Sequence, residues 1–351
     1  MYPRKLVLVA IVQALVQRHF KDAMDMVRRH QIYFNMFIDY CGWKAFIKSA
    51  SDFVQEVNNL SCITEFVCSI KNENVSKLYE AYISFPEQCL SSMDNENLHG
   101  ALSENKVTSV LMSIRKALEE QIQESSSREL CILTTLACSE PLLLEETLNR
   151  IEVIRELELH GVDDGRRKLY PSAEESLKHL LWLREPETVF NAALGLYDLS
   201  LAAIVALNSQ KDPKEFLPFL KGLECLPPSI MRYTIDLKLS RYESALRNIV
   251  SAGNEYHADC MELLNSNPQL FLLGLQLFSD PDKRHQILEA WGDHLFEEKC
   301  FGEATITYQC CSSYQKSLKA YHACGDYRRV FTVTGLLNFT KEDILQLAQE
   351  L

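Results

Sequence analysis

The chain has 351 residues, of which 47% are hydrophobic and 24% charged, with only 12 glycines and 11 prolines. This composition provides ample core material and few helix breakers, which favours helices. The formal net charge of −12 argues against direct nucleic-acid binding by the body of the chain, because phosphates are repelled by it.

The amino-terminal residues predict a buried helix. Arg4 and Lys5, followed by the apolar residues 6–12, resemble the start of a signal peptide, but no small-residue cleavage site follows. No apolar run reaches the roughly 20 residues that cross a membrane, so we expect no membrane partner. Twelve cysteines are scattered singly, unlike a secreted disulfide scaffold, and we interpret them as small buried hydrophobic residues. We expect the protein in the cytoplasm, with the nucleus as an additional site.

One spacing pattern recurs along the chain: an aromatic residue, a small one three places on, an apolar one at seven and usually a small one at ten. Its copies begin at Phe20, Tyr242, Phe301, Tyr314 and, more loosely, Tyr327. These offsets fall on one face of an α-helix, so each copy predicts a helix that packs closely against a neighbour. Short helices in series predict an all-α fold, an α-solenoid of tetratricopeptide-like antiparallel helix pairs. A compact bundle of amphipathic helices is the alternative.

Breakers and polar runs divide this array. We predict loops between helices at residues 91–106 and 123–129. Gly161, Gly165 and Pro171 interrupt the helical pattern and indicate a third loop. We predict a first helical array segment over residues 1–160 and a second, with tetratricopeptide-like repeats, over residues 173–351. Residues 161–172 form the joint if the array has one.

A segment near the middle of the chain combines a helix start with aromatic residues. Asp212 can cap a helix that begins at Pro213, where the missing N–H of proline costs nothing. Pro218 should then kink or end that helix. We interpret the segment as a rigid corner, or alternatively as a ridge on which a partner docks. Its residues are Asp212, Pro213, Lys214, Glu215, Phe216 and Phe219.

One helix pair matches the tetratricopeptide pattern well. In this pair, Gly292 lets the second helix pack closely and Ala304 faces the first. The residues that carry this repeat packing, together with Leu288, are Trp291, Gly292, Leu295, Ala304 and Tyr308.

The usual catalytic signatures do not occur in the sequence. It has no phosphate-binding loop, no dinucleotide fingerprint, no His-Glu-x-x-His and no Gly-x-Ser-x-Gly. His285 and His294 have no obvious carboxylate partner, and adjacent acids such as Glu145 and Glu146 diverge on a helix. We therefore predict that the chain is not an enzyme and has no catalytic, cofactor-binding or metal-binding residues.

Two segments resemble a known family. Residues 209–220 (SQKDPKEFLPFL) and 231–246 (MRYTIDLKLSRYESAL) are similar to the helical region of the Elongator complex subunit 1 family. Supporting matches are YPRKLVL from Tyr2, FKDAMDMVRRH from Phe20 and ACGDYRRVF from Ala323. The resemblance extends over the whole chain, and residues 209–220 are its most specific part.

The resemblance implies a non-catalytic scaffold that supports 5-carboxymethyl-type modification of the tRNA wobble uridine. In that family propeller domains precede the helical region, a carboxy-terminal segment dimerises and carries a basic tail, and the catalytic site belongs to the third subunit. The implied partners are the second and third subunits, and a second copy in the full-length protein. Since neither propellers nor basic tail occur here, we expect an interior segment or a truncated product. The alternative is a scaffold solenoid of a vesicle-coat or intraflagellar-type trafficking complex.

Overall fold

The protein is helical wherever its structure is described. The computed structural model describes residues 4–73, 105–140, 142–159, 170–209, 212–337, 339, 340 and 342. Within these ranges the regular elements are all helices and no strand occurs, which confirms the all-α prediction. None of these helices has both the length and the apolarity to cross a bilayer. The chain divides into two units, Met1–Phe216 and Leu217–Leu351. Of the joint predicted at residues 161–172, residues 161–169 lie outside the described residues.

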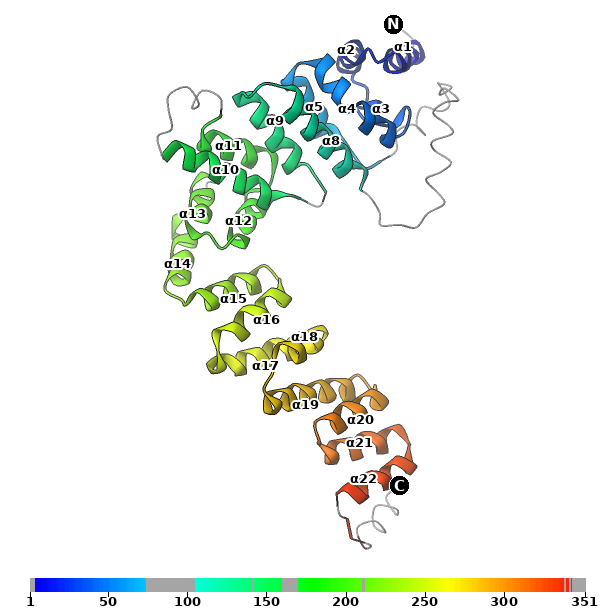
Figure 1. Ribbon diagram of the computed structural model, residues 1–351, viewed down its shortest axis with the longest axis vertical. Helices are drawn as coiled ribbons and strands as arrows, with labels where there is room; N and C mark the ends of the chain where they lie inside the picture. The colour runs from blue at the N-terminus through cyan, green and yellow to red at the C-terminus, as the bar shows by residue number, and fades with distance from the viewer. Residues whose placement is uncertain are drawn as a thin grey trace. The chain divides into compact units, whose positions relative to one another are not determined.

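The first unit is a series of helices (Figure 1). They are α1 (Arg4–Val16), α2 (Phe20–His30), α3 (Met36–Asp39), α4 (Trp43–Val57), α5 (Leu60–Ser69), α8 (Lys106–Gln121), α9 (Ser126–Ala137), α10 (Leu144–Leu159), α11 (Ala173–Leu183), α12 (Pro186–Gly195) and α13 (Leu199–Asn208). Some chain neighbours pack together, such as α12 and α13, and other contacts join helices further apart in the chain, such as α4 with α8 and α5 with α9. The next helix, α14 (Pro213–Glu224), crosses the boundary between the units. Leu8, Ile11 and Leu15 of α1 are at most 2% exposed, so the first helix is buried along one side, as predicted.

An aromatic cluster forms the core around α2 to α5. The rings of Phe20, Phe37, Phe46, Phe53 and Phe66 are each at most 1% exposed. Phe53 is central to the cluster: its ring centroid lies 4.9 Å from that of Phe66 and 5.8 Å from that of Phe20. Each such ring contributes roughly 1.5–3 kcal/mol by leaving water, with a further gain from tilted and edge-on ring pairs.

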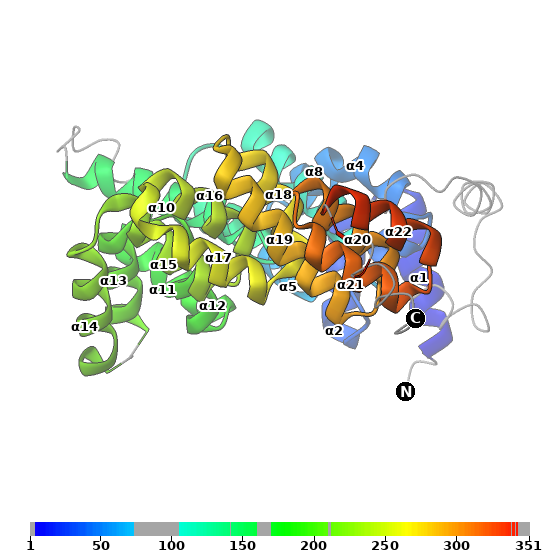
Figure 2. The ribbon, with the colours of Figure 1, turned by 90° about the horizontal axis from the view of Figure 1, so that it is seen from below.

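The second unit continues the same mode of packing. It contains α15 (Pro228–Lys238), α16 (Tyr242–Ala252), α17 (His257–Ser266), α18 (Phe271–Leu277), α19 (Pro281–Glu297), α20 (Phe301–Cys310), α21 (Tyr314–Cys324) and α22 (Tyr327–Leu336), with short 3-10 turns at Asn254–Tyr256 and Pro268–Leu270. Figures 1 and 2 show α19 to α22 side by side in chain order. This serial contact is the packing expected of an α-solenoid.

The recurring sequence pattern marks where helices begin. Helices α2, α16, α20, α21 and α22 start at the aromatic residue of each copy. The residue three places after the aromatic one is 0% exposed in all five copies. These residues are Ala23, Ala245, Ala304, Ser317 and Val330. The prediction is therefore confirmed for the small position of the stripe, whereas Cys324, at the last position of its copy, is exposed.

The same turn precedes each of these five helices. The residue two places before the aromatic has a positive φ, at Arg18 (61°), Ser240 (57°), Lys299 (63°), Ser312 (58°) and Gly325 (74°). The N–H that follows donates to the carbonyl five residues back, as from Ser313 to Tyr308 at 2.9 Å. This is a Schellman helix end, and it places the aromatic residue at the first position of the next helix. Only one of the five carries glycine, the residue that adopts this conformation without steric cost.

The cysteines are less buried than we expected. Of the ten free cysteines in the described residues, only Cys62, Cys131, Cys260 and Cys311 are buried, whereas Cys68, Cys225, Cys300, Cys310 and Cys324 are exposed. Cys138 is half-buried, and Cys41 is disulfide-bonded. The interpretation as buried hydrophobic residues is thus wrong for half of the free thiols, because these lie on outer helix faces or at helix ends.

Glycine should stabilise the turn where a side chain now occupies the positive-φ position. A left-handed backbone conformation costs an L-residue about 1–2 kcal/mol. Glycine avoids this steric cost, but it loses more chain entropy on folding, which offsets roughly 0.5–1 kcal/mol of the gain. We expect Ser312→Gly to raise the free energy of unfolding by about 0.5–1 kcal/mol in urea titrations. Gly325→Ala should lower it by about 1 kcal/mol, although a Cβ at Gly325 would meet no atom within 4 Å. If Ser312→Gly and Gly325→Ala changed the free energy of unfolding in the same direction, this account of the turn would be contradicted.

Candidate functional site

The predicted corner or docking ridge forms the beginning of α14. Asp212 caps this helix, since its Oδ1 accepts a hydrogen bond from the Lys214 N–H at 2.9 Å, and the helix begins at Pro213. Pro218 does not end the helix, which continues to Glu224, so that part of the prediction is wrong. The reason is local: proline in the second turn deprives only the Lys214 carbonyl of its donor, and Lys214 is exposed to water.

The two sides of α14 differ in character. Phe216, Leu220 and Leu223 follow one another at helical spacing and are at most 6% exposed. Phe219 is half-buried, and the Lys238 Nζ lies 3.9 Å from its ring centroid, a cation–π contact with α15. The polar residues of the segment are exposed, namely Asp212, Lys214 and Glu215. The helix thus has an anchoring face and a charged outer face, and both interpretations of the segment stay predictions.

The predicted repeat residues lie where α19 and α20 cross. A Cβ on Gly292 would stand only 2.6 Å from Cε1 and 2.7 Å from Cδ1 of Tyr308, so the Tyr308 ring occupies the space that a side chain would need. Leu295, Ala304 and Tyr308 belong to one apolar cluster. Trp291 belongs to the preceding cluster, where it stacks on Phe271 with the ring planes 11° apart. The two apolar clusters therefore meet at α19.

A polar cluster that we did not predict joins α19, α20 and α21. The Tyr308 hydroxyl donates to Asp293 Oδ1 at 2.7 Å. Lys316 Nζ lies 2.6 Å from Asp293 Oδ2 and 2.9 Å from Glu289 Oε1. Burial and the Asp293 carboxylate raise the pKa of Tyr308, so it keeps its proton and donates. Glu289 and Asp293 are one turn apart, and this spacing was the available sequence signal.

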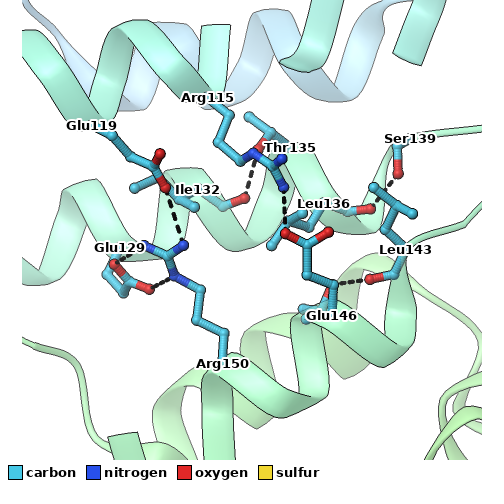
Figure 3. A network of polar contacts seen from close by, with 11 residues as sticks. Arg115, Glu119, Glu129, Ile132, Thr135, Leu136, Ser139, Leu143, Glu146 and Arg150 are labelled. Carbon is cyan, nitrogen blue, oxygen red and sulfur yellow. Dashed lines mark hydrogen bonds and ion pairs between the residues drawn. The ribbon is translucent and has the colours of Figure 1, made fainter. Parts of the chain in front are cut away.

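A second polar network joins α8, α9 and α10 (Figure 3). Arg150 of α10 donates through Nε and Nη2 to the two carboxylate oxygens of Glu129, and its Nη1 lies 3.1 Å from Glu119 Oε1. In the same layer, Arg115 Nη1 lies 2.8 Å from Glu146 Oε1. The Glu129 side chain is only 2% exposed. Burial opposes the charged form of Arg150, but the hydrogen bonds and charges of Glu129 and Glu119 outweigh it and raise its pKa.

The residues considered for chemistry are dispersed. Across the ranges that the structure describes, no group of three or more His, Cys, Asp or Glu side chains is placed to hold a metal ion. His285 lines an open pocket of about 510 Å³ with Arg284, Leu288 and Cys310. His294, by contrast, has its ring centroid 6.4 Å from that of Phe271. The two histidines thus have different surroundings, one at a pocket and one beside an aromatic ring.

Two family models together match nearly the whole chain. One, described as the ELP1 alpha-solenoid, matches residues 4–223, and the other, the ELP1 TPR domain, matches residues 230–351. The chain is 57% identical to Elongator complex protein 1 of Arabidopsis thaliana, covering 100% of the chain and 26% of that protein. Identity is 30% to the Rattus norvegicus protein of the same name, covering 99% of the chain and 25% of that protein. The chain therefore spans about a quarter of the length of these curated relatives.

A methyl group at the crossing of α19 and α20 should be costly. We expect Gly292→Ala to lower the free energy of unfolding by about 1–3 kcal/mol, because the Tyr308 ring must move. The matched control is Gly302→Ala on α20, where a Cβ meets no atom within 4 Å and alanine favours the helix. The loss of stability caused by Gly292→Ala should be smaller when Tyr308 is replaced by leucine, because the ring that meets the new methyl group is then absent. Equal effects of the two glycine substitutions in denaturant titrations would refute this view of the crossing.

Removing Arg150 should destabilise the first unit, because the buried carboxylate of Glu129 would lose its cationic partner. We expect Arg150→Met to cost about 3 kcal/mol, since Glu129 would be buried without its cation. The double variant Arg150→Met/Glu129→Met should recover most of this loss. Lys178→Ala, which breaks an exposed pair with Glu174, should change the stability far less than Arg150→Met does, because water screens that pair. Thermal unfolding of the unsubstituted chain, the two single variants and the double variant measures these differences. Similar losses of stability for Arg150→Met and Lys178→Ala would contradict the prediction.

Proposed function

Because the chain belongs to the Elongator complex protein 1 family, we propose that it acts as a non-catalytic scaffold of the Elongator complex. In this role it supports 5-carboxymethyl-type modification of the tRNA wobble uridine by holding other subunits in place. The observation that carries the proposal is the match of both helical family models, one after the other, along residues 4–223 and 230–351.

The arrangement of the helices supports a holding role. Serially packed helices each bury one face and leave the opposite face for other proteins. The networks around Arg150 and Lys316 each connect three successive helices, which restrains their relative movement. A surface that is already ordered loses less entropy when a partner binds. These features favour a scaffold that presents preformed docking faces.

Charge supports a division of labour within the complex. With a net charge of −12, the chain is poorly suited to hold tRNA through its phosphates, so we assign tRNA contact to other parts of the complex. The proposed partners are the second subunit and the catalytic third subunit, and a second copy of the chain in the full-length protein. The proposed location is the cytoplasm, with the nucleus as an additional site.

A segment exchange in a relative tests this function. We would replace the matching segment of the Arabidopsis protein with this chain, in plants lacking their own copy. We expect the chimera to co-purify with the second and third subunits and to restore 5-carboxymethyl-type uridines, measured by mass spectrometry of tRNA nucleosides. A chimera that accumulates normally but brings down neither subunit would overturn the proposal.

The same exchange separates the two interpretations of α14. The double charge reversal Lys214→Glu/Glu215→Lys changes only exposed side chains, so the melting temperature should stay within about 2 °C. If this helix face is a docking ridge, the reversal should release a subunit. If the segment is a rigid corner, co-purification should be unchanged.

A further inference from the structure

An open pocket of about 510 Å³ lies in the second unit, where residues of α18, α19 and α20 come together. This volume is in the range of pockets that bind ligands in proteins. Four of the lining residues belong to α19, namely Pro281, Arg284, His285 and Leu288. Because they follow one another at offsets of three, four and seven, they lie on one face of the helix. One helix face therefore supplies both apolar and basic groups to the pocket.

Packing between α18 and α19 fixes the walls of this pocket. Leu275 lines it from α18, and Cys310 lines it from the end of α20. Gly274, next to Leu275, is buried, and a Cβ there would stand 3.2 Å from Cδ2 of Leu264 and 3.8 Å from Cδ1 of Ile287. Such close packing leaves α18 little freedom to move relative to α19, so the pocket is formed before a ligand binds.

Three consecutive basic residues at the start of α19 have different surroundings. The Lys283 Nζ donates to the Asn254 side chain and lies 5.7 Å from the ring centroid of Phe278. Arg284 and His285, by contrast, are exposed and line the pocket. Among the described residues their side chains have no hydrogen bond or ion pair. The two basic residues at the pocket are thus the two whose polar groups are still available.

The acidic residues near Arg284 do not pair with it. Asp280 precedes α19, and its Oδ1 accepts a hydrogen bond from the Asp282 N–H at 3.2 Å. Glu289, further along the helix, has its Oε1 2.9 Å from the Lys316 Nζ. Across the described part of the chain, no carboxylate lies within ion-pair distance of the Arg284 guanidinium. This guanidinium is therefore open to a carboxylate of another molecule, although the chain has 48 acidic residues against 36 Lys and Arg.

The pocket combines apolar surface with hydrogen-bonding groups. Leu275 and Leu288 are half-buried and provide apolar wall. Arg284 offers the N–H groups of its guanidinium, Ser279 its hydroxyl and His285 its imidazole. A guanidinium can bind a carboxylate through two parallel hydrogen bonds, and an apolar side chain gains free energy by leaving water. The pocket therefore suits a ligand that carries a carboxylate beside an apolar group.

We propose that this pocket binds a peptide segment of another protein in which an aspartate or glutamate stands next to a large apolar residue. The carboxylate binds Arg284, with Ser279 and His285 as further partners, and the apolar side chain packs on Leu275 and Leu288. A peptide fits better than a small metabolite, because an open pocket does not enclose most of a ligand's surface. This binding surface is additional to the proposed scaffold role and does not depend on which complex the chain joins.

Peptide selection on the full chain tests the pocket. Random heptapeptides displayed on phage are selected on the chain, and synthetic copies of the selected peptides are measured by fluorescence anisotropy. We expect a group of peptides with Asp or Glu next to Leu, Ile or Phe. Arg284→Met should weaken their binding by about tenfold or more, which is the effect of losing a hydrogen bond to a charged group. A selection that gives no peptide whose affinity depends on Arg284 would overturn the proposal.

Lys283→Met is the matched control for Arg284→Met. It removes the same charge one residue away, from a side chain that contacts Asn254 and Phe278, and should change the affinity by less than about twofold. Replacing the acidic residues of the peptide with their amides should cost as much as Arg284→Met, and both changes together little more than either one. Additive losses would refute the pairing. Stronger binding of a single-stranded RNA oligonucleotide that depends on Arg284 would also overturn the proposal.

Cys310 reports directly whether the pocket is occupied, because it is exposed and lines the pocket. At a peptide concentration of about ten times Kd, iodoacetamide should alkylate Cys310 about tenfold more slowly, since only about one site in eleven is then free. The control is Cys300, which is exposed at the other end of α20 and should react at an unchanged rate. Peptide mapping by mass spectrometry measures both rates. Equal rates at Cys310 with and without the bound peptide would show that it docks elsewhere and would refute the assignment.

Discussion

Close approach between successive helices is the constraint on which this structure depends. The residue at the fourth position of α2, α16, α20, α21 and α22 is completely buried in every copy, and in four of the five it is alanine or serine. A small side chain there lets the neighbouring helix come near enough for the larger residues on either side to interdigitate. At Gly292 the approach is closer still, because the ring of Tyr308 fills the place of a Cβ.

The turns between helices are adapted to that constraint. A Schellman end reverses the chain within a few residues and delivers an aromatic residue to the first position of the next helix. Four of the five turns tolerate a side chain at positive φ, at a steric cost that the packing of the following helix must offset. The repeat is therefore a property of a helix together with the turn before it.

Polar networks add directional restraint to this apolar packing. The carboxylate of Glu129 is buried but receives two donors from Arg150, and Lys316 connects two carboxylates of α19 to the start of α21. Such groups contribute little net stability, because desolvation offsets much of their attraction, but a helix displaced by one turn would leave them unpaired. They favour one register of the layers, which is what the proposed holding role requires.

The sequence by itself determined the helical fold, the starts of the repeated helices, their buried stripe and the cap at Asp212, because these depend on residues a few places apart in one helix. The resemblance to the Elongator family also came from contiguous segments, and the family models agree with it. Only the tertiary structure decided that Tyr308 covers Gly292 and that Arg150 pairs with Glu129. The continuation of α14 past Pro218, by contrast, follows from the local position of this proline in the second turn of the helix, although sequence reasoning missed it. Periodicity fixes which face of a helix is buried, but the rotation and offset between helices follow from side-chain packing, and these select the partners.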